Sequence, residues 1–473
     1  MDTLRPAQWA GLALGFALGL YLLSTHLDYF ASVMFLGGIL LLEILIACLW
    51  KYEQRFLVFL IIAFAWAGMH VPLQGPWRIG RWPVLSAGAI VGYMIWFKTP
   101  RGGFRLMHLL ALFCVSAAFV SATVSQFVQM ASLKALSLLL LFLYCATGAR
   151  LAVLSHEDRF FRGLLFAAEV AVYATAICYF GLGQAIWGNP NSLGAAMSVA
   201  VFPILLWGWV SADGPTLRFR RVVVLLLCAY LIRFSMARAA IAAMVIVTVV
   251  FCLGLRQYKL LAKATGLVLV MVALAGLLAP AHLSKSLGDL KDEILYKGHK
   301  ETGVLSSRLS PWDKSVTTIK QHPWFGTGYG TSPTGEDPGL DFGVFASSAE
   351  SAREHGSSYM TIAEWVGLMG VMPFVALLAL TVVNVGRVCV WMNRTADTRH
   401  YSVPLAMVII AGLVHAAFED WLFAVGYCVC VYFWVCAFVL ADLVPAAVAA
   451  PTVTFFARPS ASPTALGTVV PNR

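Results

Sequence analysis

Residues 306–330 of this chain read SSRLSPWDKSVTTIKQHPWFGTGYG, and residues 354–359 read EHGSSY. These two stretches belong to the only long polar segment of an otherwise apolar sequence. The segment combines Arg, His and flexible Gly residues with apolar neighbours on both sides. We therefore expect the fold to be organised around it, and any functional site to draw many of its residues from it.

The composition predicts a membrane protein. The chain has 473 residues, of which 60% are hydrophobic and 12% charged, and its mean hydropathy is +0.81. Soluble domains carry about 25% charged residues. Apolar runs of roughly 17–25 residues, the length that crosses a hydrocarbon core, recur along the sequence. We expect an all-α fold, namely a polytopic transmembrane helix bundle of about 12–14 spans, with the run from Trp9 as its first span rather than a cleaved signal peptide.

The apolar runs also give the expected position of each span. The spans are predicted near residues 8–24, 29–50, 55–69, 83–97, 106–124, 131–153, 163–182, 193–211, 222–236, 239–255, 264–280, 357–382, 403–418 and 421–442. The cysteines lie in or beside these runs, which favours packing over a disulfide framework or a zinc site.

The distribution of Lys and Arg predicts the topology. The net charge of +10 falls in small groups between apolar runs, the pattern of cytoplasmic loops rather than of a nucleic-acid-binding surface. Both termini are then cytoplasmic. We expect a transmembrane bundle at residues 1–280, a large external loop domain with short helices at 281–356, C-terminal transmembrane helices at 357–442 and a disordered tail at 443–473.

The polar segment predicts a helix of its own. Ser310 is expected at its N-cap, Pro311 at the first helical position and Asp313 near the positive helix end. His322-Pro323 is expected to end the helix, because the residue before a proline avoids helical backbone.

The same helix is predicted to be amphipathic. Trp312, Val316 and Ile319 recur at helical spacing, so we expect them to form an apolar face packed on the bundle. A tight backbone with positive φ angles is predicted at the glycines that follow, Gly326, Gly328 and Gly330.

Arg308, His355 and Glu364 are the first candidates for chemistry. Arg308 precedes the predicted helix start, where a guanidinium is suited to phosphate, although an Arg paired with a loop carboxylate would look the same. His355 precedes the span predicted from residue 357, where an imidazole can take a proton from a hydroxyl or can serve as a structural residue. Glu364 would lie inside the membrane, where carboxylates are usually paired.

Two arginines and an asparagine at predicted external turns are further candidates. Arg233 and Arg238 flank such a turn against the expected charge bias, so they bind either an anionic ligand or lipid phosphates. Asn191 is expected either to cap the following helix or to bind a sugar hydroxyl. Glu419 and Asp420, an acidic pair near the end of a span, receive no role from the sequence. Neither a metal site nor a cofactor is predicted.

In order and spacing these residues resemble the O-antigen ligase and O-antigen polymerase superfamily of bacterial membrane glycosyltransferases, which are of the GT-C type. The resemblance covers roughly residues 185–385. It departs from the family pattern at Ser235, which stands three residues before Arg238 instead of beside it. The matching positions are Arg238, Arg308-x-x-x-Trp312, Pro323-x-x-Gly326-x-Gly328-x-Gly330, His355, Tyr359 and Glu364-x-x-Gly367-x-x-Gly370.

The resemblance implies a metal-independent, inverting transfer of a glycan from undecaprenyl diphosphate to an acceptor hydroxyl. It implies a multi-pass protein of the bacterial inner membrane whose active site faces the periplasm. His355 would be the catalytic base, and Arg238 and Arg308 would bind the diphosphate. Supporting roles would fall to Trp312, Tyr359, Glu364, Asn191 and Arg233.

Several functions remain open at this stage. The favoured one is an O-antigen ligase, whose acceptor is a lipid A-core sugar. A polymerase would extend another lipid-linked glycan, and a third relative would glycosylate protein hydroxyls. From another class, a transporter or flippase of polyprenyl-linked glycans predicts ionisable residues near the midplane of several spans, whereas here these residues gather at one face.

Overall fold

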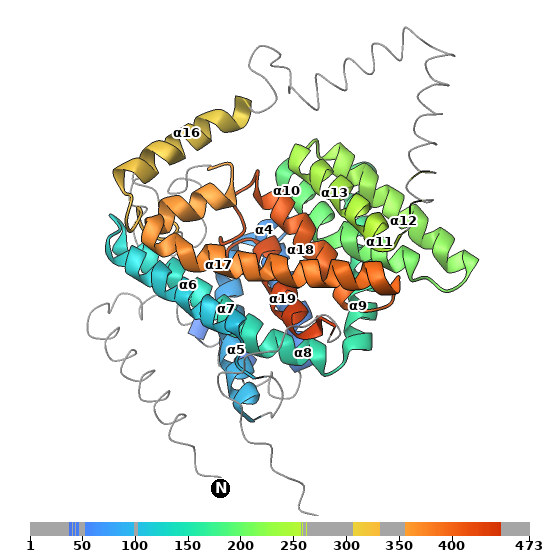
Figure 1. Cartoon of the computed structure of the whole chain (residues 1–473), viewed down its shortest axis with the longest axis horizontal. Coiled ribbons are helices and arrows are strands. Elements are labelled where there is room, and N and C mark those ends of the chain that lie inside the picture. The colour runs from blue at the N-terminus through green and yellow to red at the C-terminus, as the bar shows by residue number, and fades with distance from the viewer. Residues whose placement is uncertain are drawn as a thin grey trace, which may run out of the picture.

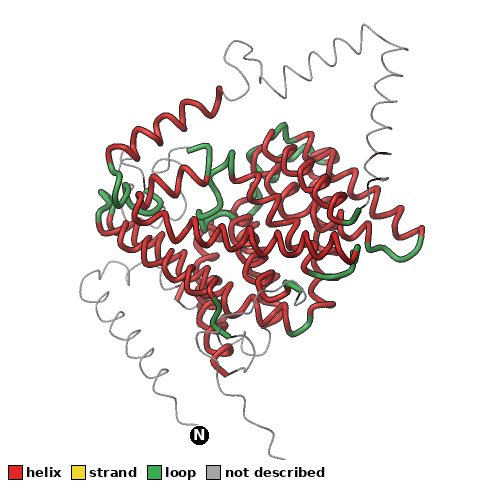
Figure 2. The backbone as a smooth tube through the Cα atoms, viewed as in Figure 1, coloured by secondary structure: helices red, strands yellow, loops and turns green. Residues whose placement is uncertain are grey.

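The described part of the chain is built from helices. The computed structural model describes residues 37–39, 41–42, 44–46, 53–98, 103–256, 258, 262, 306–331 and 355–445. Within these residues no strand occurs, and loops connect the helices (Figure 2). The longer elements are α4 (Glu53–Gly68), α5 (Gln74–Lys98), α6 (Leu106–Thr123), α7 (Val128–Tyr144), α8 (Arg150–Leu154), α9 (Glu157–Ala176), α10 (Pro190–Ala195), α11 (Phe202–Val210), α12 (Pro215–Phe234), α13 (Arg238–Gly254), α16 (Ser306–Gln321), α17 (Ser358–Thr395), α18 (Ser402–Ala416) and α19 (Cys428–Leu443).

Several of these helices are suited to a membrane. Short π-helical turns join α7 to α8 and α10 to α11, and another extends α9. Among the described residues, five helical segments are long and apolar enough to span a bilayer: Leu106–Thr123, Val128–Leu154, Glu157–Gly181, Pro190–Val210 and Ser358–Thr395. The prediction of an all-α, polytopic membrane protein is confirmed. The predicted spans at 8–24 and 264–280, most of the span at 29–50, and most of the predicted external loop and tail lie outside the described residues.

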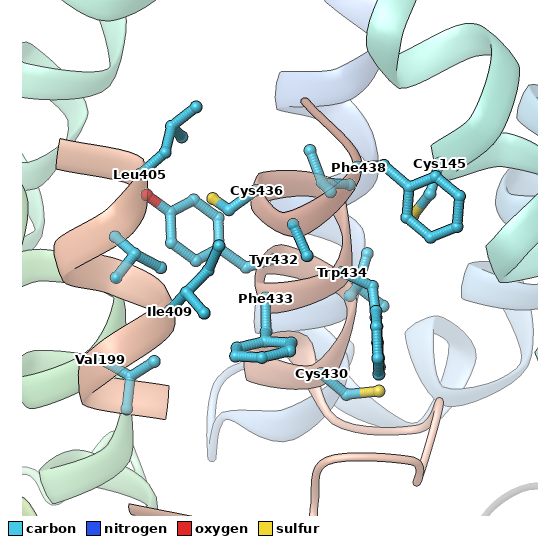
Figure 3. Packing of buried hydrophobic residues seen from close by; sticks show 14 of the residues in the cluster. Cys145, Val199, Leu405, Ile409, Cys430, Tyr432, Phe433, Trp434, Cys436 and Phe438 are labelled. Atoms are coloured by element: carbon cyan, nitrogen blue, oxygen red, sulfur yellow. The ribbon is translucent and has the colours of Figure 1, made fainter. Parts of the chain in front are cut away.

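The core is centred on α19. Every residue from Cys430 to Leu440 is buried, as expected for a helix that is apolar on all sides. Figure 3 shows its side chains packed between Leu405 and Ile409 of α18 on one side and Cys145 on the other. The predicted span at 421–442 began too early, because residues 421–427 form a loop whose Leu422 carbonyl accepts hydrogen bonds from side chains of α19.

A charged cluster lies at the far end of α19. Asp442 forms a bidentate pair with Arg150, at 2.5 and 2.9 Å, and a second ion pair with Arg105, at 3.1 Å. The Arg150 side chain is buried, and its guanidinium also contacts His108 at 2.7 Å. The cluster therefore ties α6, α8 and α19 together.

Helix α17 is broken at Gly367, where φ is 66° and ψ is −176°. The break removes helical donors from the carbonyls of Glu364 and Trp365. Backbone N–H groups of Thr327 and Gly328 replace them, at 3.0 and 3.1 Å. These donors belong to residues 323–331, which we call the glycine loop.

The exchange of hydrogen bonds runs in both directions. Beyond the break, the N–H groups of Leu368 and Met369 donate to the carbonyls of Pro323 and Trp324 in the glycine loop, at 2.7 and 3.1 Å. The predicted positive φ angles in this loop are confirmed, with values of 73°, 109° and 75° at Gly326, Gly328 and Gly330. The loop thus satisfies the backbone of a helix that is interrupted within an apolar bundle.

The start of α16 differs from the prediction. The helix begins at Ser306, so Ser310 is not its N-cap, Pro311 lies inside it, and Arg308 is in its first turn rather than ahead of it. This extra turn is stabilised by the contacts of Arg308 with Glu419 and of Trp312 with Gly356. It costs one helical hydrogen bond, because Pro311 has no backbone N–H to donate. The predicted end before His322-Pro323 is confirmed.

The face that α16 turns toward α17 also differs. Trp312 and Ile319 are half-buried as expected, but Val316 is 37% exposed. The fully covered positions between them are Ser315 and Thr318. The buried face of α16 therefore consists of the small polar residues Ser315 and Thr318, flanked by the half-buried Trp312 and Ile319.

Replacing Gly367 by Ala should destabilise the protein, whereas Gly386→Ala on the same helix should not. A Cβ at Gly367 would lie 2.5 Å from backbone atoms of Gly326 and Trp324, while nothing lies within 4 Å at Gly386. The φ and ψ of Gly367 are essentially restricted to glycine and cost another residue about 1–3 kcal/mol, and overpacking costs roughly 1–3 kcal/mol more.

Thermal unfolding in detergent, followed by the reaction of the buried thiols with a fluorescent maleimide, measures the difference. Gly386→Ala should match the parent protein or exceed it slightly, since Ala is the better helix former. Equal unfolding midpoints for Gly367→Ala and Gly386→Ala would contradict the close contact between the glycine loop and α17 at Gly367.

Candidate active site

Residues far apart in the chain meet at one end of the bundle. The end of α12, the start of α13, the first turn of α16 and the start of α17 lie there, together with residues 417–427 between α18 and α19, which we call the acidic loop. Helix α16 packs on α17, and α13 and α17 both pack on α18 (Figure 1).

His355 is held between two carboxylates. Its Nδ1 lies 3.3 Å from Oδ2 of Asp420, and its Nε2 lies 3.3 Å from Oε1 of Glu364. The backbone N–H of His355 donates to the same Asp420 oxygen at 3.3 Å. The imidazole is 1% exposed, with its ring edge-on to Trp365. Because these bonds are longer than the usual 2.9–3.0 Å, a better-placed partner could replace either carboxylate.

Arg308 lies beside Gly356, the residue that follows this histidine. Its guanidinium rests against the backbone of Gly356, where a Cβ would come within 3.3 Å of Nη1. The positive φ of 69° at Gly356 bends the chain at this point, and its carbonyl accepts a hydrogen bond of 3.2 Å from Trp312 Nε1. The sequence-predicted Trp312 therefore supports the turn between Arg308 and His355.

Arg308 also pairs with the acidic loop. Its Nη2 lies 2.5 Å from Oε1 of Glu419, and the two side chains are 15% and 16% exposed. The alternative interpretation of Arg308, as an arginine paired with a carboxylate, therefore describes this conformation. Glu419 lies 111 positions further along the sequence.

Arg238 is the second arginine near this point. It is the first residue of α13, and its guanidinium is close enough to that of Arg308 for their charges to interact. Ser235, the residue that departs from the family pattern, is buried and stabilises the turn that precedes Arg238. The Ser235 hydroxyl donates to the Ile232 carbonyl at 2.6 Å and accepts from the Ala237 N–H at 3.3 Å. This serine shapes the turn that presents Arg238.

Burial and hydrogen bonding act in opposite directions on His355 and Asp420. Burial alone would lower the pKa of His355, but the hydrogen bonds and charges of Asp420 and Glu364 outweigh it and raise the pKa above 6.5. Burial would likewise raise the pKa of Asp420, yet its bonds to His355 hold the pKa below the ordinary value. Both shifts favour an imidazolium between carboxylates.

Two of the predicted supporting residues have partners other than Arg238, Arg308 and His355. Tyr359 donates to the carbonyl of Leu413 at 2.8 Å, which anchors α17 to α18. Arg233 contacts the sulfur of Met236 within its own turn.

The predicted capping role of Asn191 is wrong. The cap of α10 is Asn189, whose Oδ1 accepts from the Asn191 N–H at 2.8 Å, with Pro190 at the first helical position. The sequence Asn-Pro-Asn offers two cap candidates, and proline at the first helical position selects the residue before it.

Glu419 and Asp420 are the residues whose place in the site the sequence did not reveal. Each pairs with a different predicted residue, Glu419 with Arg308 and Asp420 with His355. The only sequence signal was an acidic pair at the end of an apolar run, in a chain with several unexplained external cations.

Comparison with known proteins gives a match for part of the chain. Residues 223–375 match a family model described as O-antigen ligase. The matched segment contains Arg238, Arg308 and His355, and the match supports the superfamily of O-antigen ligases and polymerases. No curated protein matches the chain.

Asp420→Asn should lower the pKa of His355, because it removes one of the two carboxylates that stabilise the protonated ring. Titration of histidine-labelled protein in detergent by ¹⁵N NMR measures this pKa, with the signal assigned by its loss in His355→Gln. Asp313→Asn, an exposed position on α16, is the matched control and should leave the titration unchanged. An unaltered His355 titration in Asp420→Asn would contradict the assigned contact.

Proposed function

We propose that this chain, which carries an O-antigen ligase domain at residues 223–375, is an inverting, metal-independent glycosyltransferase. It would move a glycan from undecaprenyl diphosphate to an acceptor hydroxyl at the periplasmic face of the inner membrane. The favoured acceptor is lipid A-core, which makes the protein an O-antigen ligase. The observation that carries the proposal is the contact of Arg308 with the Gly356 turn beside His355.

The arginines suit the donor half of this reaction. As the anomeric C–O bond breaks, its electron pair stays with the diphosphate, whose charge increases. Arg238 and Arg308, whose positive charges interact, would supply positive charge for that group. A guanidinium grips phosphate oxygens bidentately, which would fix the leaving group as well as stabilise it.

His355 suits the acceptor half. The acceptor hydroxyl would replace Glu364 at Nε2 and give its proton to the ring while its oxygen forms the new bond to the anomeric carbon. Asp420 at Nδ1 would orient the ring and stabilise the imidazolium that results. Since only the neutral ring can accept the proton, the raised pKa predicts that transfer accelerates as the pH rises through it.

The rest of the bundle supports a membrane setting for this chemistry. Its long apolar helices and the buried α19 suit a multi-pass protein. The partners would be the lipid-linked donor, the glycan acceptor and membrane lipids. The Lys and Arg distribution favours cytoplasmic termini, which would place the candidate site on the periplasmic side.

Substitution of the three central residues should abolish most of the transfer. Arg238→Ala or Arg308→Ala should each lower turnover by about 10²–10³-fold, the usual effect of removing one transition-state donor. His355→Ala should cost roughly 10²–10⁴-fold. Glycan transfer by purified protein from a lipid-linked donor measures both effects.

Arg399→Ala is the matched control for the arginine variants. Arg399 pairs with Asp213 at 2.8 Å, but the two side chains are 73% and 81% exposed, so this pair contributes little. Its loss should leave turnover unchanged. Parent-level turnover in Arg308→Ala or His355→Ala would remove the proposed roles.

Deletion of the gene should separate the ligase from its relatives. Cells without a ligase accumulate long polymer on the carrier lipid, because polymerisation continues while attachment to lipid A-core stops. Single repeat units on the carrier would instead identify a polymerase. An intact polysaccharide profile with unmodified protein would point to a protein glycosyltransferase.

A further inference from the structure

The Arg308–Glu419 ion pair places a carboxylate where the proposed function needs a phosphate. The pair is short, at 2.5 Å, and both side chains keep about a sixth of their surface exposed. Carboxylates and phosphates use the same guanidinium donors. A donor diphosphate that binds Arg308 bidentately through Nη2 would therefore take over the donor that Glu419 holds in this conformation.

The backbone of Glu419 is fixed while its side chain can turn away. Its carbonyl accepts from both the N–H and the hydroxyl of Ser358, at 3.0 and 2.6 Å. The same hydroxyl accepts from the Leu422 N–H at 3.1 Å, so the acidic loop is fastened to the start of α17. Loss of the ion pair to Arg308 would then require side-chain rotation alone.

The neighbouring carboxylate, that of Asp420, binds His355 instead of Arg308. Asp420 binds both the ring and the backbone N–H of His355, so it cannot follow Arg308 without releasing the histidine. Glu419 and Asp420 are adjacent in sequence and serve different cations. This division allows one carboxylate to leave while the other stays.

The charges at the site favour such an exchange. Among the described residues, Arg308 pairs with Glu419, a protonated His355 lies between Glu364 and Asp420, and the charge of Arg238 interacts with that of Arg308. A diphosphate entering next to all three carboxylates would meet like charge, which is costly at a poorly hydrated site. Removing the Glu419 side chain from Arg308 relieves this repulsion and leaves its donors to the incoming phosphate.

We propose that Glu419 is a positioning residue that holds Arg308 at the candidate site in the absence of donor and is displaced from it by the donor diphosphate. The inference rests on the proposed function. It adds that the apparent affinity for the diphosphate group is set by competition with a carboxylate of the protein itself. Removing the charge of Glu419 should therefore strengthen anion binding, an effect opposite to that of damaging the site.

The test is the binding of inorganic pyrophosphate to the purified full-length protein in detergent, measured by isothermal titration calorimetry. Glu419→Gln should tighten binding by about tenfold, the scale of a close charge pair at a partly exposed site. Glu419→Asp keeps the competing charge and should remain near the parent protein. Asp313→Asn removes one negative charge from an exposed position on α16 and should change nothing.

The gain must act through Arg308. In Arg308→Ala, binding should weaken, and adding Glu419→Gln to it should restore nothing. With the lipid-linked donor, Glu419→Gln should lower KM without lowering kcat, a split that general damage to the fold would not produce. Unchanged or weaker pyrophosphate binding in Glu419→Gln, or a gain that persists without Arg308, would overturn the proposal.

The two proposals fail in different ways. Tighter pyrophosphate binding in Glu419→Gln without any glycan transfer by the parent protein would reject the proposed function and keep the exchange at Arg308. Normal transfer by the parent protein with no gain in Glu419→Gln would do the reverse. If neither the parent protein nor Glu419→Gln binds pyrophosphate, the exchange is rejected, and the transfer assay alone then decides the function.

Discussion

The arrangement depends on how the chain satisfies the backbone of a helix that is broken inside an apolar bundle. At Gly367 the hydrogen-bond ladder of α17 stops, and the polar groups on both sides of the break find partners in the glycine loop. In a membrane such groups have no water to turn to. The loop must therefore dock against α17, and its docking brings α16 and Arg308 to the turn that carries His355. The spacing of the glycines follows from this close approach of two backbones, because a Cβ at Gly326 would lie 2.3 Å from the Trp365 carbonyl oxygen.

A single loop then organises the charges. The acidic loop contributes consecutive carboxylates to a cation on α16 and to an imidazole just before α17, and a serine of α17 fixes the loop in place. Three segments of the chain thus depend on one another for their polar partners. The buried histidine is tolerated because both of its nitrogens have acceptors, which also makes it more basic.

Local sequence patterns predicted the helices and the glycine turns well, and long-range pairs poorly. Apolar runs located most of the helices, and His322-Pro323 located the end of α16, because both signals act over a few residues. The start of α16 was misplaced since its first turn is stabilised by contacts with Glu419 and Gly356, far away in sequence. The roles of Glu419 and Asp420 could not be predicted for the same reason, because their partners are distant in sequence. His355 and Asp420, for example, are 65 positions apart. The expected capping role of Asn191 failed at shorter range, because Asn189 on the other side of Pro190 caps α10 instead.

The charged cluster at the far end of α19 has a consequence for how the molecule is assembled. Asp442 lies 292 positions after Arg150, so ribosomes complete the arginines long before their counter-ion exists. Until α19 is made, Arg105 and Arg150 lack the carboxylate that pairs with them in this structure, and the pairing joins α6, α8 and α19 only once α19 is in place. A chain truncated before α19 would therefore keep the two arginines and lose the carboxylate that neutralises them.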